Sequence, residues 1–172
     1  MNKNISECYL KFLGDMCQKN NPQYSLTLTL GKPYSDRASI EAFSFFMKLL
    51  QKQVKTDLPR RGIAFLERTW KNARYEGQLH MHAILWGMAS YNFDADALHS
   101  KASESLLKLR DSKGLPMTSA TNLDIQPIFN VEGLVGYDTK DLFRWSPKRQ
   151  PRIYEVTKKG LDLSCQLNFA SD

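Results

Sequence analysis

The stretch that decides the fold is QLHMHAILW, residues 78–86, in which one apolar residue separates two of the chain's three histidines. Alternate residues of a β-strand point to the same face of a sheet. His80 and His82 are therefore expected to project together, with Met81 and Ala83 on the opposite face. Two neighbouring imidazoles can bind one metal ion. The pair is also compatible with two hydrogen-bonded strand histidines, so the surrounding sequence has to decide between these interpretations.

Apolar periodicity predicts alternating helices and strands around this stretch. The predicted elements are helix 5–20, strand 24–30, helix 36–55, strands 62–70 and 78–86, helix 94–110, strand 122–129, helix 130–143 and possible strands 153–156 and 164–169. From residue 24 the order matches a split βαβ, ferredoxin-like arrangement. We therefore expect an α+β fold, with a central antiparallel sheet of about five strands and helices packed mainly on one face. The other face would be free to carry a site.

Composition limits the class of protein. The chain has 172 residues, which suits one domain, and 42% of them are hydrophobic, with a mean hydropathy of -0.46. No apolar run approaches the roughly 18 residues of a membrane span, and the N-terminus has no signal-peptide pattern, so we expect no membrane association. Three widely spaced cysteines (Cys8, Cys17 and Cys165) are interpreted as reduced thiols in a cytoplasm. The net charge of +6 is compatible with a polyanionic partner without identifying one.

A carboxylate is expected beside the two histidines. Strands 62–70 and 78–86 are close enough in sequence to form an antiparallel hairpin, which would turn Glu67 toward the pair. Two histidines and a carboxylate, with coordination positions left open, suit a catalytic divalent ion better than a closed structural site. A solvated strand carboxylate is the simpler alternative for Glu67. Glu76, in the predicted turn, is a competing ligand.

A second candidate site lies in GLVGYDTK, residues 133–140. If this segment is helical, Tyr137 and Lys140 are three residues apart and share a face. A tyrosine hydroxyl has a pKa of about 10, so it needs a metal-polarised phosphate or a nearby cation to act as a nucleophile at neutral pH. Lys140 could stabilise the phenolate or bind the phosphate. Taken alone, the pair would more simply be a core tyrosine beside a lysine whose charge reaches solvent.

Taken in order, these motifs resemble those of the HUH endonucleases, and specifically the single-tyrosine initiators of rolling-circle replication. Residues 26–29 (LTLT) are similar to the first family motif, and residues 80–82 match the His-hydrophobe-His motif that names the family. Residues 137–140 (YDTK) match the third motif, and Glu67 lies where many members place a third metal ligand. The resemblance covers about residues 24–143. The 13-residue gap between Glu67 and His80 departs from the family pattern.

The resemblance implies a metal-dependent enzyme that nicks and rejoins single-stranded DNA at a specific sequence. Mn²⁺ or Mg²⁺ would be held by Glu67, His80 and His82. Tyr137 would attack the scissile phosphate, with help from Lys140, and form a 5′-phosphotyrosine link. Residues 1–172 would be a single catalytic domain, with an N-terminal helix at about 5–20 and a C-terminal extension from about 144.

The implied process is the initiation and termination of rolling-circle replication of a plasmid, phage or virus. The implied partners are single-stranded DNA at a replication origin, a host or partner helicase and a DNA polymerase, in the cytoplasm of a host cell. The chain has no Gly-rich phosphate loop, so unwinding would have to come from another protein.

Two basic clusters with interleaved aromatic residues could bind the DNA. Cations suit phosphates, and aromatic rings suit unpaired bases. Each cluster could also be an ordinary solvated face. The first cluster contains Arg68, Lys71 and Arg74, together with Trp70 and Tyr75. The second contains Arg144, Trp145, Lys148, Arg149 and Arg152.

Other functions have to be weighed against this pattern. A relaxase or transposase of the same class would use the same chemistry, and a ferredoxin-like nucleic-acid-binding module would lack the chemistry altogether. A histidine-triad nucleotide hydrolase is disfavoured, because Ile84 stands where the third alternating histidine would be. His99, in a predicted helix, is interpreted as structural or surface-exposed.

Overall fold

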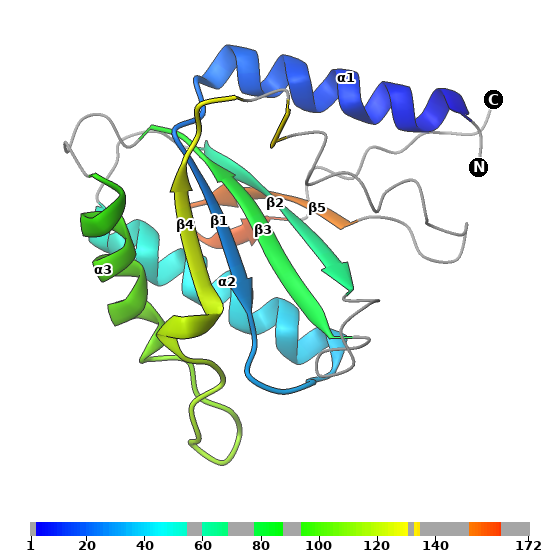
Figure 1. The fold of residues 1–172 in the computed structure, drawn as a ribbon. Coiled ribbons are helices and arrows are strands. Elements are labelled where there is room, and N and C mark those ends of the chain that lie inside the picture. The colour runs from blue at the N-terminus through cyan, green and yellow to red at the C-terminus, as the bar shows by residue number, and fades with distance from the viewer. Residues whose placement is uncertain are drawn as a thin grey trace.

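An antiparallel β-sheet forms the centre of the structure (Figure 1). The computed structural model describes residues 3–54, 60–68, 78–87, 94–130, 133–134 and 152–162. Within these ranges the helices are α1 (Lys3–Asn20), α2 (Asp36–Val54), α3 (Ala95–Leu106) and the 3-10 helix η2 (Ala120–Asn122). The strands are β1 (Tyr24–Thr29), β2 (Arg60–Arg68), β3 (Leu79–Leu85), β4 (Leu123–Pro127), β5 (Arg152–Thr157) and β6 (Gly160–Asp162).

The strand order is β4-β1-β3-β2-β5-β6, and each pair of neighbours is antiparallel. Helix α2 connects β1 to β2, and β3 lies between these two strands. Helix α3 connects β3 to β4, and β1 lies between these two. Two interleaved split βαβ units give the ferredoxin-like order, so the predicted α+β fold is confirmed. The β5–β6 hairpin extends the sheet beyond β2, giving six strands where about five were expected.

Helices α2 and α3 cover one face of the sheet, and Figure 1 shows α2 running behind the strands. Strand β1 has the predicted alternation, with Leu26 and Leu28 buried and the threonines between them half-buried. Fully burying a leucine or phenylalanine side chain stabilises a fold by about 1.5–3 kcal/mol. The helical residues buried in this layer include Phe43, Phe46, Met47, Leu50, Leu98, Ala102 and Leu106.

Helix α1 lies on the opposite face, at the end of the sheet where β1 begins (Figure 1). Its Leu13 and Cys17 are buried together with Ile63 and Ile84 of the inner strands. Asn21 ends the helix with a left-handed backbone (φ 48°), and its N–H donates to the Cys17 carbonyl at 3.1 Å. The second face was expected to be open, and α1 in fact occupies part of it.

Helix α3 ends at Leu106, four residues before the predicted end at residue 110. The chain then turns back on itself, because Arg110 pairs with Pro116 in an isolated bridge. The Asp111 carboxylate stabilises that turn by accepting the backbone N–H groups of Lys113 and Leu115. The chain therefore leaves the helical conformation although the apolar pattern continues.

Strand β6 was not predicted. It follows a tight turn at Gly160, whose φ of 110° is in the left-handed region, and it is held to α2 by a bond from Leu161 N–H to the Ser44 hydroxyl. The predicted strand 164–169 lies outside the described residues. None of the helices in the described ranges has the length and apolar character needed to cross a membrane.

Candidate metal centre

The pairing of β2 with β3 brings the predicted metal ligands together. Glu67 lies directly opposite His80, and His82 lies opposite Phe65. Since alternate residues share a face, Glu67, His80 and His82 all project to the face that carries α1. The 13-residue gap in sequence does not prevent this arrangement, because the β2–β3 register pairs Glu67 directly with His80.

The three side chains converge on one point. Nε2 of His80 is 3.3 Å from Oε2 of Glu67, and Nε2 of His82 is 3.4 Å from the same oxygen. The imidazole rings meet edge to face, with centroids 4.7 Å apart. Ligand atoms about 2.1 Å from one ion, at angles of about 90–110°, lie about 3.0–3.4 Å apart. The two carboxylate–imidazole spacings fit this geometry, and one ligand atom from each of the three side chains lies within 4.8 Å of the others, so Glu67, His80 and His82 form a candidate metal centre.

The ligand side chains of the centre are largely buried. Glu67 is 3% exposed and His82 8% exposed, and His80 is half-buried. The second carboxylate oxygen of Glu67, Oε1, is buried and accepts no hydrogen bond from any described residue. A buried oxygen without a partner costs stability, and a bound cation would satisfy it.

The charge state of Glu67 also suits a ligand. Burial by itself would raise the pKa of the carboxyl, but hydrogen bonds from His80 and His82 outweigh this effect and lower the pKa to about 2. The carboxylate is therefore ionised throughout the physiological range. An ionised carboxylate and two imidazoles form a mixed nitrogen and oxygen donor set that suits a divalent transition-metal ion.

A third strand contributes a contact that the sequence prediction missed. Thr27 of β1 lies opposite His82 from the other side, and its Oγ1 is 3.0 Å from Nδ1 of the ring. The alternation of residues 24–30 placed Thr27 on one face of a strand but did not show that β1 pairs with β3. The strand order supplies that information.

The candidate nucleophile segment begins on the same face as the metal centre. Asn130 caps a helical turn by accepting the N–H of Gly133 at 3.0 Å. Leu134 packs against the cluster that contains Phe65 and Ile84. Leu134 is the last described residue before Tyr137.

The side chains of the remaining predicted site residues are not described, so their positions stay predictions. Arg68 and Arg152 are described only as backbone positions, at the end of β2 and the start of β5. The residues outside the described ranges are the predicted catalytic pair Tyr137 and Lys140, the alternative ligand Glu76 and the basic residues Lys71, Arg74, Arg144, Trp145, Lys148 and Arg149.

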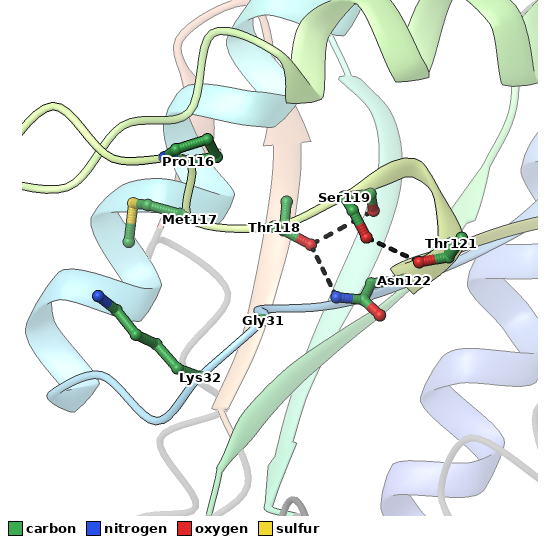
Figure 2. Close-up of a pocket in the computed structure, with 8 residues that line it drawn as sticks. All are labelled: Gly31, Lys32, Pro116, Met117, Thr118, Ser119, Thr121 and Asn122. Carbon is green, nitrogen blue, oxygen red and sulfur yellow. Dashed lines mark hydrogen bonds between the residues drawn. The ribbon is translucent and has the colours of Figure 1, made fainter.

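A hollow of about 370 Å³ lies at the end of the sheet where β1 ends and β3 begins (Figure 2). It is tied to the metal-binding strands, because the Thr118 hydroxyl donates to the Thr29 carbonyl and the Gln78 amide donates to the Lys32 carbonyl. Among the described residues that line it, the one cation is Lys32, which is paired with Asp111 at 3.0 Å. Figure 2 shows the Ser119 and Thr121 hydroxyls bonded to each other, and the Asn122 amide donating to the Thr118 hydroxyl. The hollow therefore offers no concentrated charge that would hold a phosphate.

Known proteins add nothing to this geometry: no family model, curated protein or solved structure matches the chain. The convergence of Glu67, His80 and His82 remains the basis for assigning a function.

Proposed function

We propose that the protein is a metal-dependent HUH-type endonuclease that initiates and terminates rolling-circle replication by nicking and rejoining single-stranded DNA. The observation that carries the proposal is the convergence of Glu67, His80 and His82 on one face of a ferredoxin-like sheet. The motif order along the chain, with Tyr137 after the histidine strand, adds to it. An isolated pair of strand histidines would not require a buried, ionised carboxylate between the two rings.

The proposed chemistry assigns a role to each predicted residue. Glu67, His80 and His82 hold Mn²⁺ or Mg²⁺, which, when bound, acts as a Lewis acid on the scissile phosphate. The Tyr137 oxygen bonds to phosphorus as the bond to the 3′ oxygen breaks, and that oxygen leaves as a 3′-hydroxyl. Lys140 stabilises the phenolate or binds the phosphate. Because the 5′-phosphotyrosine link conserves the bond energy, a later 3′-hydroxyl can reverse the step without ATP.

The placement of Leu134 supports the role of Tyr137. Leu134 packs on the face that carries the metal centre, and Tyr137 follows three residues later. Three residues span at most about 10 Å of chain, so Tyr137 would lie within about 10 Å of Leu134 and thus near that face.

The net charge of +6 supports a DNA partner. We place phosphate and base contacts in the clusters Arg68, Lys71 and Arg74 and Arg144, Trp145, Lys148 and Arg149. The proposed partners are the origin strand, a host or partner helicase and a DNA polymerase, and the proposed location is the host cytoplasm.

A cleavage assay tests the proposal. Labelled single-stranded DNA from the protein's own replicon is incubated with Mn²⁺, and covalent protein–DNA adducts are separated on a denaturing gel. Wild type is compared with Tyr137→Phe, His82→Ala and an EDTA-treated sample. Tyr24→Phe and His99→Ala are matched controls, because Tyr24 packs on the opposite face of the sheet and His99 lies on α3.

The outcomes separate the alternatives. An adduct that is lost in Tyr137→Phe, His82→Ala and EDTA but kept in both controls establishes the enzyme and its nucleophile. An adduct that survives Tyr137→Phe keeps the class and refutes the nucleophile. DNA that is bound but never cut favours a non-catalytic nucleic-acid-binding module.

A further inference from the structure

A hydrogen bond joins the candidate metal centre to strand β1. Oγ1 of Thr27 is 3.0 Å from Nδ1 of His82. The other ring nitrogen, Nε2, faces the Glu67 carboxylate. The two nitrogens of one imidazole therefore have different partners, a hydroxyl on one side and the candidate metal-binding carboxylate on the other.

The position of the ring proton decides whether His82 can bind an ion. Nε2 can bind a metal only when the proton is on Nδ1, and Nδ1–H then donates to Oγ1 of Thr27. In the other tautomer the Thr27 hydroxyl donates to Nδ1, and Nε2–H donates to the Glu67 carboxylate. A hydroxyl both donates and accepts, so Thr27 can pair with either form.

Thr29 provides a comparison on the same strand. Its side chain projects to the same face as that of Thr27, lies opposite His80 and is also half-buried. Its hydroxyl makes no hydrogen bond to a residue within the described ranges. The two threonines therefore differ in the contact with a histidine ring rather than in their position in the sheet.

We propose that Thr27 is a positioning residue of the metal centre, which fixes the orientation of the His82 ring and supports the Nδ1-protonated form that binds an ion through Nε2. This inference rests on the metal-binding part of the proposed function and not on the nuclease chemistry. Outer partners of metal-binding histidines typically change metal affinity by roughly 10–100-fold.

A metal titration tests the proposal directly. Mn²⁺ binding is followed by electron paramagnetic resonance for wild type, Thr27→Val, Thr27→Ser and Thr29→Val. Valine keeps the shape of threonine and removes the hydroxyl, and serine keeps the hydroxyl. Thr27→Val is expected to bind Mn²⁺ roughly 10–100-fold more weakly, whereas Thr27→Ser and Thr29→Val stay close to wild type. Circular dichroism checks folding, and Thr27→Ala replaces the valine variant if that variant does not fold.

A spectroscopic readout separates positioning from general destabilisation. Nitrogen-15 spectra of the histidine side chains, recorded with Zn²⁺ as a diamagnetic probe, report which ring nitrogen carries the proton. His82 is expected to be protonated at Nδ1 in wild type and Thr27→Ser, and to lose that uniform state in Thr27→Val. Equal Mn²⁺ affinities and the same His82 tautomer in wild type and Thr27→Val would overturn the role of Thr27 and leave the metal centre standing. A wild type that binds neither ion would overturn both.

Discussion

Glu67 is held between two opposing effects. Burial raises its pKa, and the hydrogen bonds from His80 and His82 lower it further than burial raises it, to about 2. The ionised state of the carboxylate therefore depends on the hydrogen bonds from the two rings, and the rings in turn need the carboxylate as their acceptor. This mutual dependence makes the centre sensitive to the loss of any one of the three side chains.

The depressed pKa of Glu67 predicts a loss of stability in acid. When folding lowers the pKa of a carboxyl, the ionised carboxylate stabilises the folded state at pH values above the ordinary pKa. This contribution is lost as the pH falls toward and through the pKa of the folded state. In EDTA, the advantage of wild type over Glu67→Gln in the free energy of unfolding should shrink by on the order of 2 kcal/mol between pH 5 and about 2. Urea titrations at several pH values measure it, and an advantage that does not change with pH would contradict the prediction.

Removal of one proposed ligand should abolish most of the metal binding. His82→Ala and Glu67→Ala are expected to weaken Mn²⁺ binding by more than about 100-fold, since loss of an outer partner alone typically costs 10–100-fold. His99→Ala is the matched control, because His99 contacts Ser103 within α3. Isothermal titration calorimetry measures the three affinities. Similar affinities in His82→Ala and His99→Ala would refute the site.

The ligand set could be predicted from the sequence because strands have a simple period of two. His80 and His82 share a face for that reason alone, and a hairpin brings Glu67 opposite them. The Thr27 contact could not be predicted in the same way. It depends on β1 pairing with β3 across 55 residues of sequence, and local periodicity carries no information about that neighbour.

The helices show where periodicity is insufficient. The apolar stripe of α1 predicts that one side of the helix is buried, but not which face of the sheet it meets. In α3 the apolar pattern continues to Leu109, which is buried, although the helix ends at Leu106. Burial and helical conformation are separate properties, and the pattern reports only burial.

Two glycines should respond in opposite ways to replacement by alanine. Gly160 has a φ of 110° and lies against the backbone of Ser44, so Gly160→Ala is expected to lower the free energy of unfolding by about 2 kcal/mol or more. Gly14 lies inside α1 with open space around it, so Gly14→Ala should raise the free energy of unfolding by about 0.5–1 kcal/mol. Urea denaturation measures both. Changes of the same sign would show that one of the two environments is described wrongly.

For the whole molecule, the order of elements was enough to predict the topology. A βαββαβ succession leaves few ways to pair the strands, and the split arrangement is one of them. The β5–β6 hairpin was harder to predict, because β6 has only three residues and too short a pattern to read. In the sequence, only Gly160 pointed to a turn before β6.

The proposed contacts between the second basic cluster and DNA predict a salt-dependent affinity. For single strands the logarithm of the affinity falls with the logarithm of salt concentration, with a slope of about -0.7 for each phosphate contact. Lys148→Gln and Arg149→Gln should each reduce the steepness of that slope by about 0.7. Lys101→Gln should not change it, because Lys101 is paired with Glu104 on α3. Fluorescence anisotropy at several salt concentrations measures the slopes, and equal slopes in all variants would remove the second basic cluster from the interface.

The position of the metal-binding strands has a consequence for how an ion would be acquired. Strand β3 lies between β1 and β2, so His80 and His82 stand on backbone that is paired on both sides. Glu67 of β2 is paired with His80 and lies next to the last described β2–β5 pair, at Leu66. Amide protons in such inner strands exchange last, when the whole molecule opens. An empty centre would therefore keep its shape, and the ion could be removed and replaced without refolding. Which ion occupies it would then follow the free-ion pool around the mature protein rather than the conditions under which the chain was synthesised.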